Sequence, residues 1–436
     1  MKVFIQTLGC EKYTVDSENA ASLLVDSGCV LTDDPSDADI FIVNTCGFIK
    51  DAKQQSIETI FDLSRAKTEG KRLIVTGCLS QRYAKELEKE MPEVDAFLGV
   101  NNYQDLADIV WGRDPSRSRT DRASGCYQEL GDRILMTQPW SRSIKIAEGC
   151  SNICSYCIIP SIRGKYRSRK EEDILKEAEA LAKDGCKELV VIAQDITFYG
   201  KDLGIKDALP KLLNKLCRIE GIEWIRLMYC YEDEITDELI ETIKNNDKIC
   251  NYIDIPLQHI SDRVLKKMNR KSTSESIRST ITKLRKNIPD ITIRTTMICG
   301  FPGETKEDFE MLMDFVEDAR FDRLGAFTYS KEEGTKAAEM KPQVRSDVKQ
   351  RRWEKLMSLQ RGIALDKNRD LIGKTLRVLI EEQEDENTYI GRSYMDAPDI
   401  DNSVIFTSEK KLHPGEFADV LITDAFDYDI TGKAVE

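Results

Sequence analysis

The sequence predicts an α/β protein with three folded parts. These are an N-terminal doubly wound parallel α/β domain, a central incomplete (β/α)6 TIM-like barrel and a C-terminal OB-like β-barrel. Strand-length apolar runs alternate with helical patterns in the first hundred residues, six more strand candidates follow, and short strands separated by Gly, Pro and Asp end the chain. At 436 residues the chain exceeds the usual size of one hydrophobic core, so several domains are expected.

The N-terminal domain is expected over residues 1–112. Its strand candidates alternate with helical patterns, which is typical of a parallel sheet with helices on its faces. The next segment, residues 113–141, contains a run rich in Gly, Ser, Arg and Pro and is predicted to be a linker or mobile loop. The expected strands of the domain are 2–8, 38–45 and 72–77, and its helices lie near 17–27, 50–67 and 80–90.

The central barrel is expected over residues 142–370. Each of its first five strands is followed by a helical segment, and a long charged helix at about 344–370 leads out. Barrels of this kind place their chemistry at the carboxyl ends of the strands. The expected strands are 143–149, 188–195, 224–230, 252–258, 291–299 and 323–330.

The C-terminal β-barrel is expected over residues 371–436, from four short strands at 375–382, 388–395, 403–406 and 416–423. This segment contains 15 acidic and 6 basic residues, so it has a net charge of −9 within a chain total of −13. Such a module is a poor binder of RNA phosphates and a plausible binder of a basic protein.

Composition narrows the function classes. No run approaches the roughly 18 apolar residues of a membrane span, and no signal peptide is evident, so we expect a soluble cytoplasmic protein. Thirteen cysteines in such a chain favour metal or cluster ligation over disulfides. The only histidines, His259 and His413, leave little material for catalytic triads or mixed Cys/His zinc sites.

Three cysteines form the strongest motif. Cys150, Cys154 and Cys157 follow the first barrel strand, with three and then two residues between them. Three thiolates are one ligand short of a closed four-ligand site, which favours a 4Fe-4S cluster with one open iron. The alternative is a zinc site completed by a distant cysteine.

The stretch CSNICSYC resembles the CxxxCxxC signature of the radical S-adenosylmethionine superfamily. This resemblance implies that S-adenosylmethionine chelates the open iron, and that an electron from the cluster cleaves it to a 5′-deoxyadenosyl radical. The protein orients the cofactor and excludes side reactions. Tyr156 stands where the superfamily usually has an aromatic near the adenine, although core packing explains it equally well.

A second set of cysteines follows three strands of the N-terminal domain. Cys10, Cys46 and Cys78 each occupy a loop after a strand, and in a parallel sheet such loops share the edge where ligands bind. A single cysteine is often only a small buried hydrophobe, but three strand ends in succession predict a second cluster with an open iron. The remaining cysteines are expected to be structural: Cys29, Cys126, Cys186, Cys217, Cys230, Cys250 and Cys299.

The three parts together resemble the methylthiotransferase family along essentially the whole chain. The last module is similar to a TRAM domain, and GFPGET at 300–305 matches a family motif. Further matches lie in CIIPSIRGKYRSR, namely Pro160, Arg163, Gly164, Ser168 and Arg169.

Candidate contacts to S-adenosylmethionine lie at or just after the barrel strands. Gln194 and Asp195 end one strand, Gln258 and His259 end another, and glycines let a backbone approach a ligand closely. The GFPGE stretch could also be a bare turn, and for Arg294 buried pairing within the barrel is as plausible as cofactor contact. The predicted cofactor-binding residues are Tyr156, Gln194, Asp195, Arg294, Gly300, Gly303 and Glu304.

Members of the family modify either an adenosine of transfer RNA or an aspartate of small-ribosomal-subunit protein twelve. The segments 391–401 (GRSYMDAPDID) and 329–338 (YSKEEGTKAA) are similar to the protein-modifying branch, and the acidic C-terminal module agrees. We expect the protein substrate, although DAPDID could be only an Asp/Pro turn. The alternatives are a transfer-RNA methylthiotransferase of the same fold and a zinc-stabilised RNA-binding module without catalysis.

The resemblance implies a reaction that uses two molecules of S-adenosylmethionine. One donates a methyl group to sulfur at the second cluster, and the other supplies the radical that takes hydrogen from the aspartate β-carbon, which then receives the methylthio group. No acid–base pair is needed at that carbon. The expected partners are the basic ribosomal protein and an electron donor such as flavodoxin or ferredoxin, and we expect a monomer.

Overall fold

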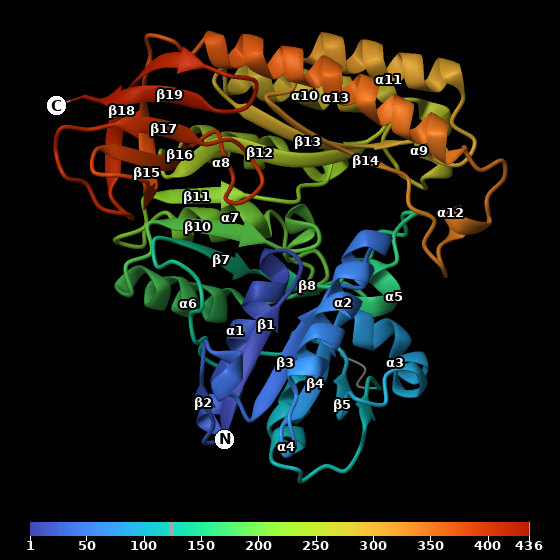
Figure 1. The fold of residues 1–436 in the computed structure, drawn as a ribbon. Coiled ribbons are helices and arrows are strands. Elements are labelled where there is room, and N and C mark those ends of the chain that lie inside the picture. The colour runs from blue at the N-terminus through green and yellow to red at the C-terminus, as the bar shows by residue number, and fades with distance from the viewer. Residues whose placement is uncertain (122–125, 436) are drawn as a thin grey trace.

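The computed structural model describes residues 1–121 and 126–435 of the chain. It contains a six-stranded parallel sheet, a second six-stranded parallel sheet and a closed five-stranded barrel, in chain order. Figure 1 shows the N-terminal part below the central one and the C-terminal barrel at its upper left. The predicted fold class is therefore confirmed. No helix within the described residues is long and apolar enough to cross a membrane.

The N-terminal sheet has the strand order β2-β1-β3-β4-β5-β6. Helices α1 and α4 contribute to the core on one face, and α2 and α3 contribute to a separate core on the other. This is the doubly wound arrangement that the alternating pattern predicts. The strands are β1 (Lys2–Thr7), β2 (Val30–Leu31), β3 (Ile40–Thr45), β4 (Arg72–Gly77), β5 (Ala96–Leu98) and β6 (Ser118–Arg119); the helices are α1 (Glu11–Asp26), α2 (Lys50–Ala66), α3 (Cys78–Glu90) and α4 (Leu106–Val110), with short 3-10 turns at Pro35–Asp37 and Tyr103–Asp105.

Two boundaries in this region differ from the expectation. Helix α1 begins at Glu11 rather than near 17, because its first turns bury polar residues. Asp16 pairs with Arg163 of the central barrel, and Glu18 pairs with Arg133 of the segment before that barrel. Strand β6 lies inside the predicted linker and extends the sheet by pairing with β5. Residues 122–125 of that linker lie outside the described residues.

The central sheet has the order β14-β13-β12-β11-β10-β7 with all neighbours parallel. Strands β7 and β14 stay unpaired with each other, so the barrel is incomplete, as predicted. The strands are β7 (Ser141–Lys145), β10 (Glu188–Ile192), β11 (Trp224–Leu227), β12 (Ile249–Gln258), β13 (Thr292–Cys299) and β14 (Arg323–Thr328); the helices are α6 (Glu171–Lys183), α7 (Ala208–Leu216), α8 (Asp237–Lys244), α9 (Asp262–Lys267), α10 (Ser274–Asn287), α11 (Lys306–Ala319) and α13 (Ser346–Arg369). Shorter elements are β8 (Ala147–Glu148), β9 (Arg167–Ser168), α5 (Ile159–Arg163), α12 (Lys336–Glu339) and the 3-10 turns Ile196–Phe198 and Glu232–Glu234.

The C-terminal barrel closes in the order β15-β16-β17-β19-β18. Its core contains the stacked rings of Tyr389 and Phe406, whose centroids lie 5.6 Å apart. The sequence pattern predicts four of its strands and misses the fifth, β19, because ITGKA has few large apolar residues. The strands are β15 (Thr375–Gln383), β16 (Thr388–Ser393), β17 (Val404–Thr407), β18 (Phe417–Ala425) and β19 (Ile430–Ala434).

Buried ion pairs fasten the C-terminal barrel to the central one. Arg392 on β16 reaches Glu188 on β10 at 2.6 Å, and Glu188 also accepts from Arg226 on β11 at 2.7 Å. Two aspartates of the segment 396–401 extend this contact, since Asp396 pairs with Arg323 and Asp401 with Arg294. This segment is therefore more than a turn between strands: its carboxylates hold the two domains together.

Candidate active site

A cavity of about 470 Å³ lies between the N-terminal domain and the carboxyl ends of the central strands. Residues from both domains form its wall, and cysteines of both predicted sets are among them. This is the end of the barrel where such folds carry their chemistry. The lining cysteines are Cys10, Cys46, Cys150, Cys154, Cys157 and Cys230. Cys230, which the sequence pattern groups with the structural cysteines, thus also faces this space.

The barrel set lies in the loop that follows β8. Gly149 directly precedes Cys150 and has φ +79°, and a Cβ there would lie 2.3 Å from the backbone oxygen of Lys165. Only glycine fits this turn without strain. The Cys154 sulfur lies 3.4 Å from the hydroxyl of Tyr231, which comes from the loop after β11. The tight packing of Gly149 against Lys165 and the contact between Cys154 and Tyr231 thus hold the three-cysteine loop at the cavity.

Burial shapes the acidity of the barrel thiols. It raises the pKa of Cys150 to about 11 and that of Cys157 to about 12. Metal ligation requires thiolates, so loading of this site releases protons. Within the described part of the chain, no three His, Cys, Asp or Glu side chains are gathered closely enough to hold a single metal ion. Three soft sulfur donors beside open cavity space fit the donor set of an iron–sulfur cluster with one free position.

The second set lies at the ends of three neighbouring strands. Cys10 follows β1 and occupies the N-cap position of α1, Cys46 follows β3, and Cys78 is the first residue of α3. Helix N-termini favour thiolates. Cys46 and Cys78 are buried beside Tyr13, whose hydroxyl lies 3.5 Å from the Cys46 sulfur. Cys78 does not itself line the cavity, and burial raises its pKa.

A buried charge network joins the two domains next to the cysteines. Arg163 of α5 donates to Asp16 of α1 at 3.0 Å and to Glu148 of β8 at 2.8 Å. Lys145 of β7 pairs with the same two carboxylates. Arg163 also lines the cavity and lies 5.1 Å from the centroid of the Tyr13 ring. Because all four charges are paired, the network fixes how the two cysteine sets face each other.

Lys12 is a cavity residue that the sequence pattern does not reveal. Its side chain is largely buried, with a relative exposure of 8%, and its ammonium lies 3.1 Å from the centroid of the Tyr229 ring. Burial lowers its pKa. Among the described residues it has no hydrogen bond or ion pair. A signal for it existed in the GCEK stretch, where the lysine follows a cysteine of the second set.

Two strand-end residues of the barrel also line the cavity with unusual backbones. Tyr229 follows β11 with φ +64°, and Gln258 ends β12 with φ +70°. Non-glycine residues rarely adopt this left-handed region, and such positions cluster at functional sites. Tyr229 was missed by sequence reasoning because positive φ leaves no local pattern.

Some predicted cofactor residues do face the cysteines. Tyr156 lines the cavity, and its hydroxyl accepts from Arg270 at 3.3 Å. Gln194 lines it as well and donates to Glu148 at 2.7 Å, while its own buried side-chain oxygen has no partner among the described residues. Asp195 lies just behind the wall and accepts from Asn152 at 2.9 Å. These three residues therefore lie with the barrel cysteines.

The other predicted cofactor residues lie elsewhere. Arg294 pairs with Asp254 at 2.8 Å and with Asp401 of the C-terminal barrel at 3.2 Å, which is the buried pairing that the sequence left open. Glu304 accepts from the backbone of Gly300 at 2.7 Å and from Arg352 of α13 at 2.6 Å. The cavity lined by the cysteines is not lined by any of these predicted residues, namely Arg294, Gly300, Gly303 and Glu304. The structure does not bring the GFPGE turn or Arg294 together with the cysteines, because their polar groups are occupied by structural partners.

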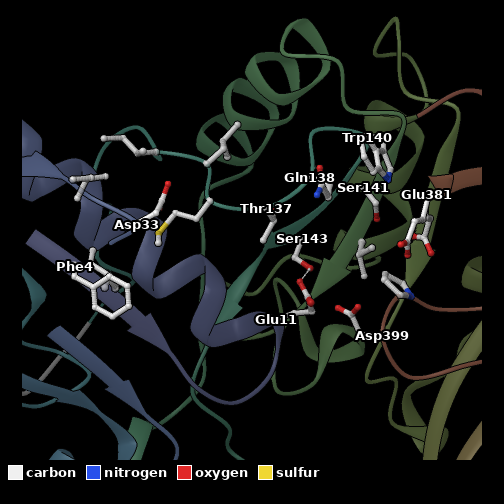
Figure 2. Close-up of a pocket in the computed structure, with 18 of the residues that line it drawn as sticks. Phe4, Glu11, Asp33, Thr137, Gln138, Trp140, Ser141, Ser143, Glu381 and Asp399 are labelled. Atoms are coloured by element: carbon white, nitrogen blue, oxygen red, sulfur yellow. Dashed lines mark hydrogen bonds between the residues drawn. The ribbon is translucent and has the colours of Figure 1, made fainter. Parts of the chain in front are cut away.

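A second, larger cleft of about 770 Å³ opens where all three parts of the chain meet. Its wall includes residues of β1 and the following helix, the segment before β7, and the C-terminal barrel (Figure 2). Figure 2 shows Glu11 beside Asp399 and close to Ser143, which donates to Glu11 at 2.7 Å. Burial, reinforced by the neighbouring Asp399, raises the pKa of Glu11. Further carboxylates in the wall are Asp33, Glu381 and Glu382.

Known families match three successive stretches of the chain. Residues 2–99 match the uncharacterized protein family UPF0004, residues 144–316 the radical SAM superfamily and residues 372–435 the TRAM domain. Over 436 residues the chain is 51% identical to the ribosomal protein uS12 methylthiotransferase RimO of Thermoanaerobacter sp. (strain X514), covering 99% of both chains. It is 49% identical to the proteins of the same name from Lachnoclostridium phytofermentans, over 440 residues and all of both chains, and Clostridioides difficile (strain 630), over 439 residues, all of this chain and 99% of that one.

Solved structures share the fold at low identity. The radical S-adenosylmethionine methyltransferase TsrM of Kitasatospora setae superposes with a TM-score of 0.56 at 15% identity, over 74% of this chain and 72% of that one. The cobalamin-dependent S-adenosylmethionine radical enzyme OxsB gives a TM-score of 0.53 at 14% identity, over 83% of this chain and 56% of that one. Both agree with the arrangement of strands and helices described above.

Proposed function

The chain belongs to the RimO family of ribosomal protein uS12 methylthiotransferases, and from this membership we propose the reaction that its cavity carries out. The enzyme is a radical S-adenosylmethionine transferase that inserts a methylthio group at the β-carbon of an aspartate of uS12. One S-adenosylmethionine donates the methyl group, and a second is the source of the 5′-deoxyadenosyl radical. The relatives do not favour the transfer-RNA alternative.

The observation that carries this proposal is that cysteines of both sets line one cavity. Insertion of a sulfur-containing group at a C–H bond requires hydrogen removal and sulfur delivery at the same carbon. Cys10 and Cys46 from the N-terminal domain and the three barrel cysteines line a single space, so one substrate carbon can be reached from both. Two separate cavities would not allow this.

The cysteines are proposed to hold two 4Fe-4S clusters, one on each set. A cluster bound by Cys150, Cys154 and Cys157 would supply the electron for reductive cleavage of S-adenosylmethionine. The protein's own part is to hold the cofactor and exclude water. Tyr156 and Gln194 offer an aromatic face and a free amide oxygen toward it. The apolar side chains Phe48, Ile49, Ala52 and Ile159 line the same space, and an apolar wall favours the exclusion of water.

The acidic cleft supports a basic protein as the partner. Ribosomal proteins bind RNA and are generally basic, and carboxylates such as Glu11, Glu381 and Asp399 would attract Lys and Arg side chains. The cleft adjoins the cysteine cavity through α1, since Glu11 lines one and Lys12 the other. We propose that the C-terminal barrel docks uS12 here, in the cytoplasm, and that a monomer receives electrons from a flavodoxin or ferredoxin.

Mass spectrometry of uS12 tests the proposed function. The full-length enzyme is reconstituted anaerobically with iron and sulfide and incubated with reductant, S-adenosylmethionine and uS12. A methylthio group in place of hydrogen on one aspartate is the expected product. Cleavage of S-adenosylmethionine with no change in uS12, and methylthiolation of transfer RNA instead, would overturn the choice of substrate.

A pair of cysteine variants tests the division of labour. Cys154→Ala should abolish cleavage of S-adenosylmethionine because it removes a ligand of the barrel site. Cys46→Ala should retain cleavage and lose methylthiolation because only the second site is damaged. Product from Cys46→Ala would contradict the assignment of the second cluster.

A further inference from the structure

We propose that Lys12 binds the side-chain carboxylate of the substrate aspartate and so positions its β-carbon between the two cysteine sets. The inference rests on the proposed function and assigns a specificity-determining residue to it. It explains which group in the cavity selects a carboxylate-bearing substrate.

The first argument is that Lys12 is the cavity cation left without a partner within the described residues. Arg163 donates to two carboxylates, and Arg270 pairs with the buried carboxylate of Glu232. Among the described residues, the ammonium of Lys12 lies against the face of the Tyr229 ring and near the Cys10 thiol, and it has no carboxylate partner. Burial of an ammonium without a hydrogen-bonded anion is unfavourable, so a buried, unpaired lysine facing a cavity indicates an anionic ligand.

The second argument is that the protein's own carboxylates cannot serve Lys12 in this arrangement. Asp254 is one carboxylate that interacts electrostatically with Lys12. The oxygens of Asp254 already accept hydrogen bonds from Arg294 at 2.8 Å and from the backbone of Tyr229 at 3.1 Å. Glu148, another, accepts from Arg163, Lys145 and Gln194. Both already accept from other donors. The acidic group that acts most strongly on Lys12 is the thiol of Cys10. In the proposed enzyme this sulfur is a ligand of the second cluster, so a carboxylate that binds Lys12 directly comes from outside the chain.

The third argument is position. Lys12 belongs to the N-terminal domain, two residues after Cys10, yet its ammonium lies over a side chain from the end of barrel strand β11. Tyr229 is held there in a left-handed backbone conformation by its hydrogen bond to Asp254. A backbone held in this region at a cavity wall is typical of a site that needs exact placement. A carboxylate bound to Lys12 therefore lies between the domains that carry the two cysteine sets.

Substrate chemistry fits this placement. In an aspartate the β-carbon is bonded directly to the carboxylate carbon, so anchoring the carboxylate fixes the carbon that reacts. An adenine base has no carboxylate and would gain nothing from the ammonium. The lysine thus favours a protein substrate over a nucleoside at the same kind of cavity.

Two enzyme variants and one substrate variant test the proposal. Lys12→Met removes the charge and keeps the length, and Lys12→Arg retains the charge. The full-length reconstituted enzymes are titrated with uS12 and with uS12 whose target aspartate is replaced by asparagine, measuring Kd and the separate KM and kcat for methylthiolation. Iron and sulfide contents and the absorption spectrum check that both clusters are loaded, because Lys12 is close to Cys10. Lys50→Met, at an exposed position of the same domain, is the matched control.

Loss of a charge-assisted hydrogen bond predicts that Lys12→Met raises Kd and KM for uS12 by about 10- to 100-fold, with Lys12→Arg recovering much of this. The wild-type enzyme should bind the asparagine form of uS12 more weakly by a similar factor, whereas Lys12→Met should no longer distinguish the two forms. Lys50→Met should behave as wild type.

The proposal is overturned if the wild-type enzyme binds both forms of uS12 equally, a measurement that does not depend on any enzyme variant. It is also overturned if Lys12→Met alters cluster content or spectrum while uS12 affinity is unchanged. Failure of the wild-type enzyme to methylthiolate uS12 at all would instead reject the proposed function, and this inference with it.

Discussion

Glu188→Gln should loosen the C-terminal barrel from the central one. Glu188 is completely buried, accepts from Arg226 at 2.7 Å and from Arg392 at 2.6 Å, and also accepts from the hydroxyl of Ser141 at 2.7 Å. The amide keeps the shape of the side chain but removes its charge. Two buried guanidinium groups then face each other across a neutral group.

The expected loss follows from the acidity of this carboxyl. The two arginines lower the pKa of Glu188 from 4.5 to about 2, against the opposing effect of burial. At about 1.4 kcal/mol per pKa unit, this corresponds to about 3 kcal/mol of stability. Because the folded-state pKa is depressed, the contribution is fully present above the ordinary value near 4.5 and is lost as the pH falls toward about 2. The wild type and variant should therefore differ at neutral pH and converge in acid.

Native-state hydrogen exchange on the cluster-free protein measures this loss where it occurs. The amides of β10, β11 and β16 should exchange roughly 100-fold faster in Glu188→Gln at pH 7, while those of the N-terminal sheet are unchanged. Glu223→Gln is the matched control, because Glu223 forms an exposed pair with Arg377 at 3.1 Å across the same interface. That change should cost less than about 0.5 kcal/mol. Equal effects of the two substitutions, or a difference that does not shrink in acid, would refute the reasoning.

Three further substitutions give distinct outcomes. Gly149→Ala should lower the amount of iron bound at the barrel site, because the Cβ of the alanine would collide with the Lys165 backbone. Full iron loading of this variant would show that the turn at Gly149 is not needed to position the cysteines. Arg163→Met should cost about 3–5 kcal/mol in urea unfolding, since two buried carboxylates lose a shared cation, and a loss below about 1 kcal/mol would argue against the network. Glu304→Gln should cost about 1–3 kcal/mol through its contact with Arg352, with the Kd for S-adenosylmethionine unchanged. A large loss of cofactor affinity there would return Glu304 to the cofactor site.

Much of the fold follows from local patterns. The two parallel sheets, including the six strands of the central barrel, can be predicted from the sequence because each main strand is an apolar run bounded by turn residues. Prediction fails where an element is short or its buried residues are polar. Strand β19 has little apolar signal, and the first turns of α1 look exposed because Asp16 and Glu18 are charged. Those charges are buried only because the central barrel and the segment before it supply their partners.

The candidate site divides in the same way. The sequence by itself determines the donor chemistry, since sulfur ligands and their spacing after Cys150 are properties of the chain, as is the acidity of the last module. Only the tertiary structure decides which groups face one another. It directs Arg294 to Asp401, more than 100 residues away, and Glu304 to α13. Within the described residues, it leaves Lys12 at the cavity with no carboxylate partner. Local sequence patterns indicate which residues are buried and where the chain turns. The role of a buried charge depends instead on its partner, which the fold brings from a distant part of the chain.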